Sequence, residues 1–247
     1  MPGRITIEIC AYSVDSAIAA QSAGADRIEL CASAEEGGIT PSRGAIDLAR
    51  ESLHIPLHVI VRPRGGDFLY TGTEFAEMQR DIAYLREAGA DGIACGILTA
   101  DGHVDTDRCR DLARLASPMS FTFHRAFDFT ADPLRALEDI IACGCSRILT
   151  SGQQASAEKG ADLIAELVKR AGDRIAIMPG GGISDGNLPA LIRRTGAREF
   201  HASARKTMPS AMRFRNPKVS IGSSDDQTVV VDAVKVERLC RIAHEYQ

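Results

Sequence analysis

The sequence has no long run of apolar residues and no strong excess of charge of either sign. No stretch approaches the roughly 18 uncharged apolar residues of a membrane-spanning helix. The N-terminal segment, M-P-G-R-I-T-I-E-I-C, lacks the apolar run of a signal peptide. A net charge of −4 gives no electrostatic footprint for nucleic acid or for an anionic membrane. We therefore expect a cytoplasmic protein that binds neither nucleic acid nor membrane.

The motifs of several common cofactor and metal sites are absent as well. The chain has seven cysteines but no C-x-x-C, and their odd number and scatter argue against a disulfide framework. No G-x-G-x-x-G turn follows the first apolar run, and we expect no nucleotide cofactor. No lysine stands at an expected strand end as an obvious Schiff-base residue, although Lys206 lies just beyond the last strand.

What the chain does contain is a repeated unit. Glycine lies between a helix-like stretch and a short apolar run in S-A-G-A-D-R-I-E-L (22–30), E-A-G-A-D-G-I-A-C (87–95), A-C-G-C-S-R-I-L-T (142–150) and R-T-G-A-R-E-F-H-A (194–202). Glycine commonly ends a helix in the left-handed conformation, and the run that follows has strand character. Each copy therefore predicts a junction from helix to strand.

Strands and helices are predicted to alternate along the whole chain. We expect strands at 4–10, 27–31, 57–63, 92–97, 120–126, 147–151, 175–179 and 199–203. We expect helices at 13–23, 42–53, 73–88, 105–116, 132–143, 155–171, 184–195 and 233–246. This alternation predicts an α/β protein, a (β/α)8 TIM barrel that forms a single domain over residues 1–247. An open doubly wound sheet is the alternative, which the missing glycine-rich turn disfavours.

One connection is much longer than the others. Residues 206–232 follow the last expected strand and carry the basic residues Lys206, Arg213, Arg215 and Lys218. They end in T-V-V-V (228–231), a candidate short strand. Long loops are usually functional or disordered. A basic lid over the barrel mouth and a solvated, mobile insertion are both consistent with this segment.

Polar residues gather near the C-terminal ends of the expected strands, where barrels of this kind carry their chemistry. They are Glu8, Cys10, Glu29, Cys31, His58, Arg62, Arg64, Asp67, His124, Arg125, Asp128, His201 and Ser203. A layer of internal salt bridges would explain one or two pairs among them. So many titratable groups at one end of the barrel favour a ligand site, with candidate acids and bases among the carboxylates and histidines.

The segment F-T-F-H-R-A-F-D (121–128) mixes charged and aromatic residues in an apparent core strand. Alternation along a strand directs Phe121 and Phe123 to one side, against the helices, and His124 and Asp128 to the other. Charged groups are seldom buried unless they are paired or used. We therefore expect His124 and Asp128 to face a ligand together.

Two further segments suit an anion. Three glycines, Gly180, Gly181 and Gly182, follow the seventh strand and lead into a helix expected to begin at residue 184. Glycine amides beside a helix N-terminus favour phosphate, although a tight turn alone would also need glycine.

The second anion segment is R-P-R-G-G-D-F-L-Y (62–70). The forked guanidinium groups of Arg62 and Arg64 suit a carboxylate or a phosphate. The two glycines would let Asp67 and Phe68 fold back across the mouth. A charged surface turn is the structural alternative.

Metal binding is a separate hypothesis. Cys10 and Cys31 are expected on neighbouring strands with the same facing, and thiolates select soft ions such as Cu(I). Two ordinary core cysteines are the alternative, and an ion held by Glu8, Glu29 and a histidine is a third. Cys143-Gly-Cys145 lies at the opposite end of the barrel, where we expect a role in stability.

Several of these motifs together resemble the copper homeostasis protein CutC family. They are I-E-I-C (7–10), G-A-D-R-I-E-L-C (24–31), G-G-I-T-P-S (37–42), R-P-R-G-G-D-F-L-Y (62–70), F-H-R-A-F-D (123–128), I-L-T-S-G (148–152), P-G-G-G-I (179–183) and E-F-H-A-S-A (199–204). The resemblance implies a (β/α)8 barrel, a cytoplasmic location, a homodimer or higher homo-oligomer, and a role in copper handling. It carries Cys10 and Cys31 over as copper ligands.

Two functions follow from these observations. The first is a copper-binding homeostasis protein, a carrier or sensor of Cu(I). The second is a lyase, aldolase or isomerase that acts on a small phosphorylated or carboxylated metabolite. In the second, the candidate acids and bases are Glu8, Glu29, His58, His124 and Asp128. The anion would be held by Arg62, Arg64, Asp67, Arg125, Gly180, Gly181, Gly182, His201 and Ser203.

Overall fold

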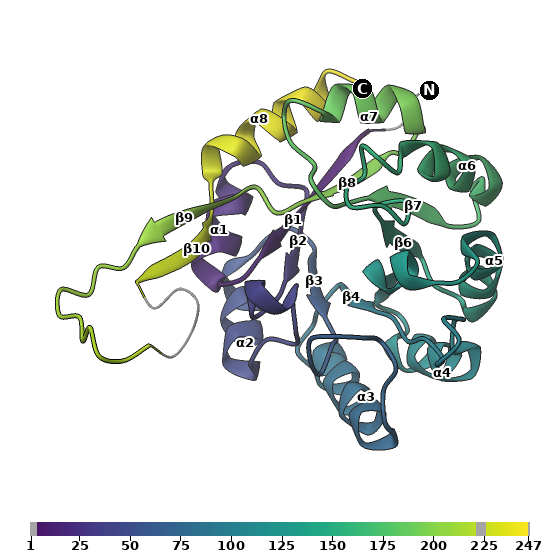
Figure 1. Cartoon of the computed structure of the whole chain (residues 1–247), viewed down its shortest axis with the longest axis horizontal. Coiled ribbons are helices and arrows are strands. Elements are labelled where there is room, and N and C mark those ends of the chain that lie inside the picture. Colours follow the sequence, from purple (N-terminus) through teal and green to yellow (C-terminus); the bar gives the residue numbers. More distant parts are fainter. Residues whose placement is uncertain (1–3, 221–225, 247) are drawn as a thin grey trace.

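Eight parallel strands surrounded by helices form a barrel in the computed structural model, which describes residues 4–220 and 226–246 (Figure 1). The strands are β1 (Thr6–Ala11), β2 (Arg27–Leu30), β3 (Leu57–Ile60), β4 (Gly92–Cys95), β5 (Ser120–Phe123), β6 (Arg147–Thr150), β7 (Ala176–Pro179) and β8 (Glu199–Ala202). They pair in the order β7-β6-β5-β4-β3-β2-β1-β8, and a parallel bridge between Gly180 and His201 closes the ring. The predicted TIM barrel is therefore confirmed.

The helices cover the outside of this barrel. They are α1 (Val14–Ser22), α2 (Arg43–Ser52), α3 (Gly72–Glu87), α4 (Thr106–Ala116), α5 (Pro133–Cys143), α6 (Ala161–Ala171), α7 (Leu188–Thr195) and α8 (Ala233–His244). Two short 3-10 helices, η1 (Ala34–Glu36) and η2 (Arg125–Phe129), lie in loops after β2 and β5. Among the helices of the described part of the chain, none combines the length and apolar character that a membrane crossing needs.

Glycines end the helices where the repeated unit predicts it. Gly24, Gly89, Gly144 and Gly196 all have positive φ, between 71° and 94°. A residue with a side chain rarely adopts this conformation, and glycine therefore stops each helix and turns the chain into the next strand. The four predicted junctions are confirmed.

Two helices begin later than expected. We expected helices from residues 155 and 184, but α6 begins at Ala161 and α7 at Leu188. Before α6, two glycines bring loop backbones together: a Cβ on Gly152 would lie 2.3 Å from the carbonyl oxygen of Gly160. The segment between them is therefore a compact loop and not a first helical turn.

The long connection after β8 forms an antiparallel hairpin. Its strands are β9 (Arg205–Pro209) and β10 (Gln227–Val231), and β10 includes the predicted strand T-V-V-V. The hairpin extends sideways from the barrel (Figure 1), and its described residues 210–219 are almost all exposed. In this arrangement the described residues of 206–232 do not cover the mouth as a lid; residues 221–225 lie outside the description.

Inside the barrel, side chains alternate between two environments. In β1, Ile7 and Ile9 pack into the apolar layer against the helices. Glu8 and Cys10, which alternate with them, are also buried but point inward. The interior is therefore the polar side of this strand, as the alternation predicts.

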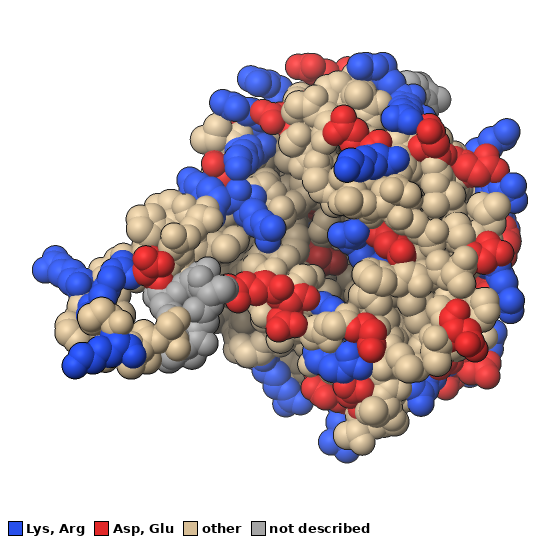
Figure 2. Space-filling view, in the orientation of Figure 1, with Lys and Arg blue, Asp and Glu red and all other residues tan. Residues whose placement is uncertain are grey.

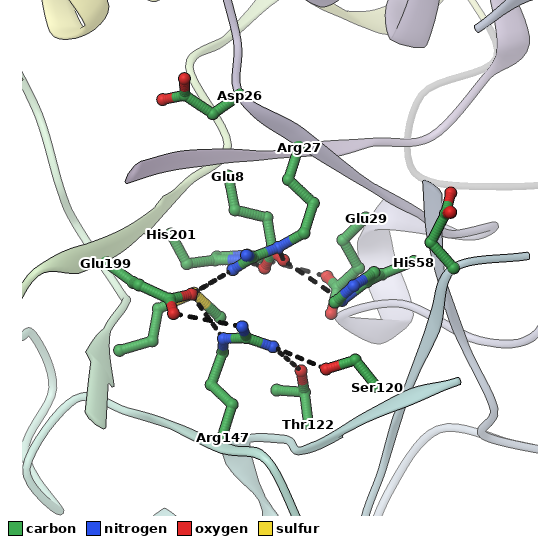
Figure 3. A network of polar contacts seen from close by, with 12 residues as sticks. Glu8, Asp26, Arg27, Glu29, His58, Ser120, Thr122, Arg147, Glu199 and His201 are labelled. Carbon is green, nitrogen blue, oxygen red and sulfur yellow. Dashed lines mark hydrogen bonds and ion pairs between the residues drawn. The ribbon is translucent and has the colours of Figure 1, made fainter. Parts of the chain in front are cut away.

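A network of buried ion pairs lies inside the barrel, toward the N-terminal ends of the strands (Figure 3). Arg27 Nε donates to Glu8 Oε2 at 2.5 Å, and Arg27 Nη2 donates to Glu199 Oε2 at 2.6 Å. Arg147 binds the same Glu199 carboxylate through Nε at 2.5 Å and Nη2 at 3.1 Å. Its Nη1 donates to two hydroxyls, those of Ser120 and Thr122. An internal salt-bridge layer therefore exists, and Glu8 is the predicted strand-end residue that takes part in these pairs. The other charged members, Arg27, Arg147 and Glu199, are the first residues of β2, β6 and β8 and were not predicted from the sequence.

Replacing Glu199 with alanine should destabilise the fold strongly, because it leaves Arg27 without one of its partners and Arg147 without the carboxylate that it pairs with. Breaking a buried pair in this way typically costs about 3–5 kcal/mol. Urea denaturation of Glu199→Ala would measure the loss. Glu166→Ala is the control, since its pair with Arg170 is exposed and should contribute about 0.5 kcal/mol or less. Equal losses in both variants would contradict the role of the network.

Candidate functional site

A cavity of about 510 Å³ opens at the C-terminal ends of the strands. Figure 2 shows the molecule hollowed over the centre of the barrel, with acidic and basic side chains around the opening. Nine of the predicted residues line this cavity: Cys10, Glu29, Arg62, His124, Arg125, Gly181, Gly182, His201 and Ser203. Sequence reasoning missed Tyr12, Phe129, Leu149 and Arg205, which also line it. Arg205 begins β9, after β8 has ended at Ala202 and the chain has turned at Ala204 with its positive φ of 40°, so strand alternation gave no signal for it.

Cys10, which lines the cavity, lies in contact with Cys31. Cys10 is in β1, and Cys31 follows β2 with its amide bonded to the Ala11 carbonyl at 2.9 Å, which extends the ladder. Their sulphur atoms are 3.6 Å apart, and Cys31 Sγ lies 3.4 Å from Glu29 Oε2. Contact with the Cys31 thiol holds the pKa of Cys10 well below its ordinary value, whereas burial raises the pKa of Cys31.

His201 links two buried carboxyl groups beside these thiols (Figure 3). Its Nδ1 lies 2.7 Å from Glu8 Oε1 and its Nε2 lies 3.7 Å from Glu29 Oε2. Burial alone would lower the pKa of His201, but the acidic groups around it raise it well above its usual value.

The two carboxyl groups differ in their tendency to ionise. Burial opposes ionisation of Glu8, yet the neighbouring Arg27 holds the pKa of Glu8 well below its ordinary value. Glu29 has no such guanidinium, and burial raises its pKa to about 8.

Two overlapping groups of side chains could hold a metal ion within the described residues. One is Cys10, Glu29 and Cys31; the other is Glu8, Glu29 and His201. In each group the ligand atoms lie within 4.8 Å of one another. The first offers two sulphurs to a soft ion, and the second offers oxygen and nitrogen to a harder one. In the second group, Glu8 already shares its charge with Arg27 at 2.5 Å.

His124 and Asp128 do not form the expected pair. The strand β5 ends at Phe123, and the chain then enters η2, where strand alternation no longer applies. Asp128 accepts from Arg125 Nε at 2.8 Å and from Thr150 Oγ1 at 2.6 Å, so it anchors the neighbouring loops. Phe123 packs in the apolar core, as does Phe121, as expected.

The histidines His58 and His124 are buried against two glycines, Gly92 in the neighbouring strand β4 and Gly96 just after it. A Cβ on Gly92 would lie 2.4 Å from His58 Nε2, and one on Gly96 would lie 2.7 Å from His124 Nδ1. His58 lies inside the barrel, 3.7 Å from Glu8 Oε2, and does not line the cavity. Glycine at these two positions was a sequence signal for the imidazoles that the pattern analysis overlooked.

These two imidazoles resist protonation. Burial lowers the pKa of His58 to about 4 and that of His124 to about 3, the latter with help from the charge of Arg62. His124 Nδ1 accepts from the Ala126 amide at 3.2 Å, and its buried Nε2 has no hydrogen-bond partner in the described part of the chain.

The arginine loop also differs from expectation. Arg62 donates to the carbonyls of Glu36 at 2.6 Å and of Gly38 and Gly66 at 2.9 Å. Arg64 instead pairs with Asp67 and Glu74 at the surface, away from the cavity. Phe68 does fold back over the mouth, with its ring centroid 5.1 Å from that of His124.

The glycine loop lines the cavity but does not begin a helix. Gly181 and Gly182 have φ of 95° and 80°, which favours glycine, and both line the cavity. Because α7 begins only at Leu188, the helix N-terminus expected beside them is displaced along the chain. The expected phosphate cradle therefore lacks its helix, while its glycine backbone is in place. Gly180 is used in closing the barrel through its bridge with His201.

The buried histidines predict a dependence of stability on pH. The unfolded chain binds protons near pH 6.5 that the folded imidazoles exclude until about pH 4 or below. The free energy of unfolding should therefore fall with pH below 6.5, by up to about 1.4 kcal/mol per pH unit for each such histidine. Urea denaturation of His124→Gln should show a shallower fall, whereas the exposed control His244→Gln should keep the original slope. An unchanged slope in His124→Gln would contradict a neutral buried imidazole.

Comparison with known proteins shows which family has this sequence. The model of the CutC family matches residues 5–206. A CutC family protein from Chromobacterium violaceum is 55% identical over 218 residues, which cover 88% of each chain. The human copper homeostasis protein cutC homolog is 47% identical over 241 residues, which cover 96% of this chain and 88% of the human protein.

Solved structures agree with the sequence comparison. A CutC crystal structure from Streptococcus agalactiae has a TM-score of 0.77 and 33% identity, covering 81% of this chain and 98% of that one. Phosphoribosylanthranilate isomerase from Thermotoga maritima covers 98% of this chain and 99% of its own, with a TM-score of 0.59. At 11% identity, the isomerase shares the fold alone. With its family model, its relatives and its barrel in agreement, this chain belongs to the CutC family.

Proposed function

We propose that this protein binds Cu(I) through Cys10 and Cys31 and acts in copper homeostasis as a carrier or sensor. The observation that carries the proposal is the 3.6 Å separation of the two sulphur atoms, of which that of Cys10 belongs to a residue lining the cavity. Thiolates are the protein ligands that Cu(I) prefers. The relatives named as copper homeostasis proteins support the same role. A cytoplasmic location and a homo-oligomeric state, which the family resemblance implies, complete the proposal.

The protonation of the site favours a soft ion over a hard one. The lowered pKa of Cys10 favours the thiolate form that Cu(I) binds. By contrast, the pKa of Glu29 is raised to about 8, which keeps this carboxyl largely uncharged near neutral pH. Glu8, the other carboxylate of the alternative group, is held by Arg27 at 2.5 Å. Cys10 is therefore favoured in its ionised form, whereas Cys31, whose pKa burial raises, must give up its proton on binding copper.

Removing both thiols should abolish copper binding. In an anaerobic titration against a chromophoric Cu(I) chelator, the natural chain should take up about one equivalent, and Cys10→Ala/Cys31→Ala should take up none. Cys109→Ala/Cys145→Ala is the matched control, because these sulphurs are also buried and only 3.9 Å apart but lie outside the cavity. Unchanged uptake by the first double variant would refute the proposed site.

The size of the cavity favours a second candidate, catalysis on a small anionic metabolite. A volume of about 510 Å³ is far larger than an ion needs and lies within the range of small-molecule sites, about 300–1,000 Å³. His124 would be its acid or base, since Nε2 is free of partners among the described residues. This candidate expects a phosphorylated or carboxylated metabolite to raise the melting temperature of the copper-free chain, and less so in His124→Gln. A screen with no stabilising compound would count against it.

A further inference from the structure

The wall of the cavity around Cys10 is rich in guanidinium groups. Arg62, Arg125 and Arg205 all line it; Arg62 follows β3, Arg125 begins η2 and Arg205 begins β9. Of the two thiols, Cys10 lines the cavity and Cys31 lies behind it. A molecule in the cavity would therefore contact both the outer thiol and the cationic wall.

The charge of Arg62 is buried without a carboxylate partner in the described part of the chain. Its side chain is among the buried charged residues, with 6% exposed. Its donors reach three backbone carbonyls, and its guanidinium lies 5.1 Å from the centre of the Phe68 ring. Carbonyls satisfy the hydrogen bonds but do not neutralise the charge. A buried uncompensated cation is costly, and an anion in the cavity would reduce that cost.

The other two guanidinium groups have donors to spare. Arg125 uses Nε for Asp128 and Nη2 for Ser151, while its Nη1 lies over Gly181, 3.7 Å from where a Cβ would be. Arg205 is exposed, and its side chain contacts no acceptor among the described residues. Facing these cations are two carboxyl groups, those of Glu29 and Glu36.

The copper thiols leave room for a ligand on the same side. With metal–sulphur bonds of about 2.3 Å, as zinc thiolates have, two sulphurs 3.6 Å apart would hold an ion in a bent arrangement. A bent pair keeps a coordination position open, and the cavity lies on the Cys10 side. The buried, unpartnered Nε2 of His124 marks a further polar group in the cavity wall without a protein partner.

We propose that copper arrives as the complex of a small thiol that carries anionic groups, and that the mouth cavity binds those groups during transfer. This inference rests on the proposed Cu(I) site. Bonds from Cys10 and Cys31 to copper replace the two bonds to carrier sulphur, and the Cys31 proton passes to a departing carrier thiolate. Copper stays Cu(I) throughout, so the step needs no oxidant or reductant.

The test compares a thiol carrier that bears carboxylates with an uncharged one. Cu(I) is presented to the copper-free chain as its complex with mercaptosuccinate, a thiol with two carboxylates, or with uncharged 2-mercaptoethanol, and the rate of transfer is measured anaerobically. The charged complex should transfer at least about tenfold faster at low salt, as electrostatic steering provides. Arg205→Gln should remove several-fold of this advantage and leave transfer from 2-mercaptoethanol unchanged. Arg110→Gln, on the outer helix α4, should behave like the natural chain.

The outcomes separate this inference from the copper site itself. Equal transfer from both carriers, or an advantage that Arg205→Gln does not reduce, would overturn the anionic carrier, while the chelator titration would still report on Cys10 and Cys31. Added inorganic phosphate should slow transfer only from mercaptosuccinate. If phosphate raised the melting temperature of the copper-free chain without slowing that transfer, the cavity would bind a free anion and not a carrier, which would also overturn the proposal.

Discussion

The structure depends on the carboxylate of Glu8, which two parts of the barrel share. One oxygen accepts from Arg27 at 2.5 Å within the interior ion-pair network, and the other lies 2.7 Å from His201 at the mouth (Figure 3). A buried charge is tolerable only when it is paired and hydrogen-bonded, and Glu8 meets this requirement from both sides. The interior that holds the strands together thereby also fixes the imidazole beside the candidate metal thiols.

The two contacts of Glu8 also influence the pKa values of the ionisable groups at the mouth of the barrel. Arg27 and His201 lower the pKa of Glu8, and the acidic groups beside His201 raise the pKa of His201 well above its usual value. Glu29 has no guanidinium of its own, and burial raises its pKa to about 8. The surroundings thus lower the pKa of Glu8 and raise that of Glu29. A change in the charge of either group would alter the pKa of Cys10, which also depends on His201. The pKa of Cys10 is therefore tied to the protonation of the carboxyl and imidazole groups around it.

The fold was predictable from local patterns, because helix-ending glycines and strand alternation act within a few residues. The same rule placed Cys10 beside Cys31. It failed for His124 and Asp128, since the strand had already ended at Phe123 and a 3-10 helix has another periodicity. It also could not foresee that Arg62 would bind loop carbonyls, because those acceptors come from a different loop. Features set within one helix or strand could be predicted from the sequence, whereas contacts between different loops could not.

The two glycines beside the buried imidazoles carry an evolutionary consequence. Gly92 and Gly96 yield their space to His58 and His124 from the strands on either side, so a Cβ at either position would strike an imidazole. Substitutions are therefore expected to be coupled within two pairs of positions, 58 with 92 and 96 with 124. A descendant could enlarge one member only after the other had become smaller, and related chains should show such paired exchanges.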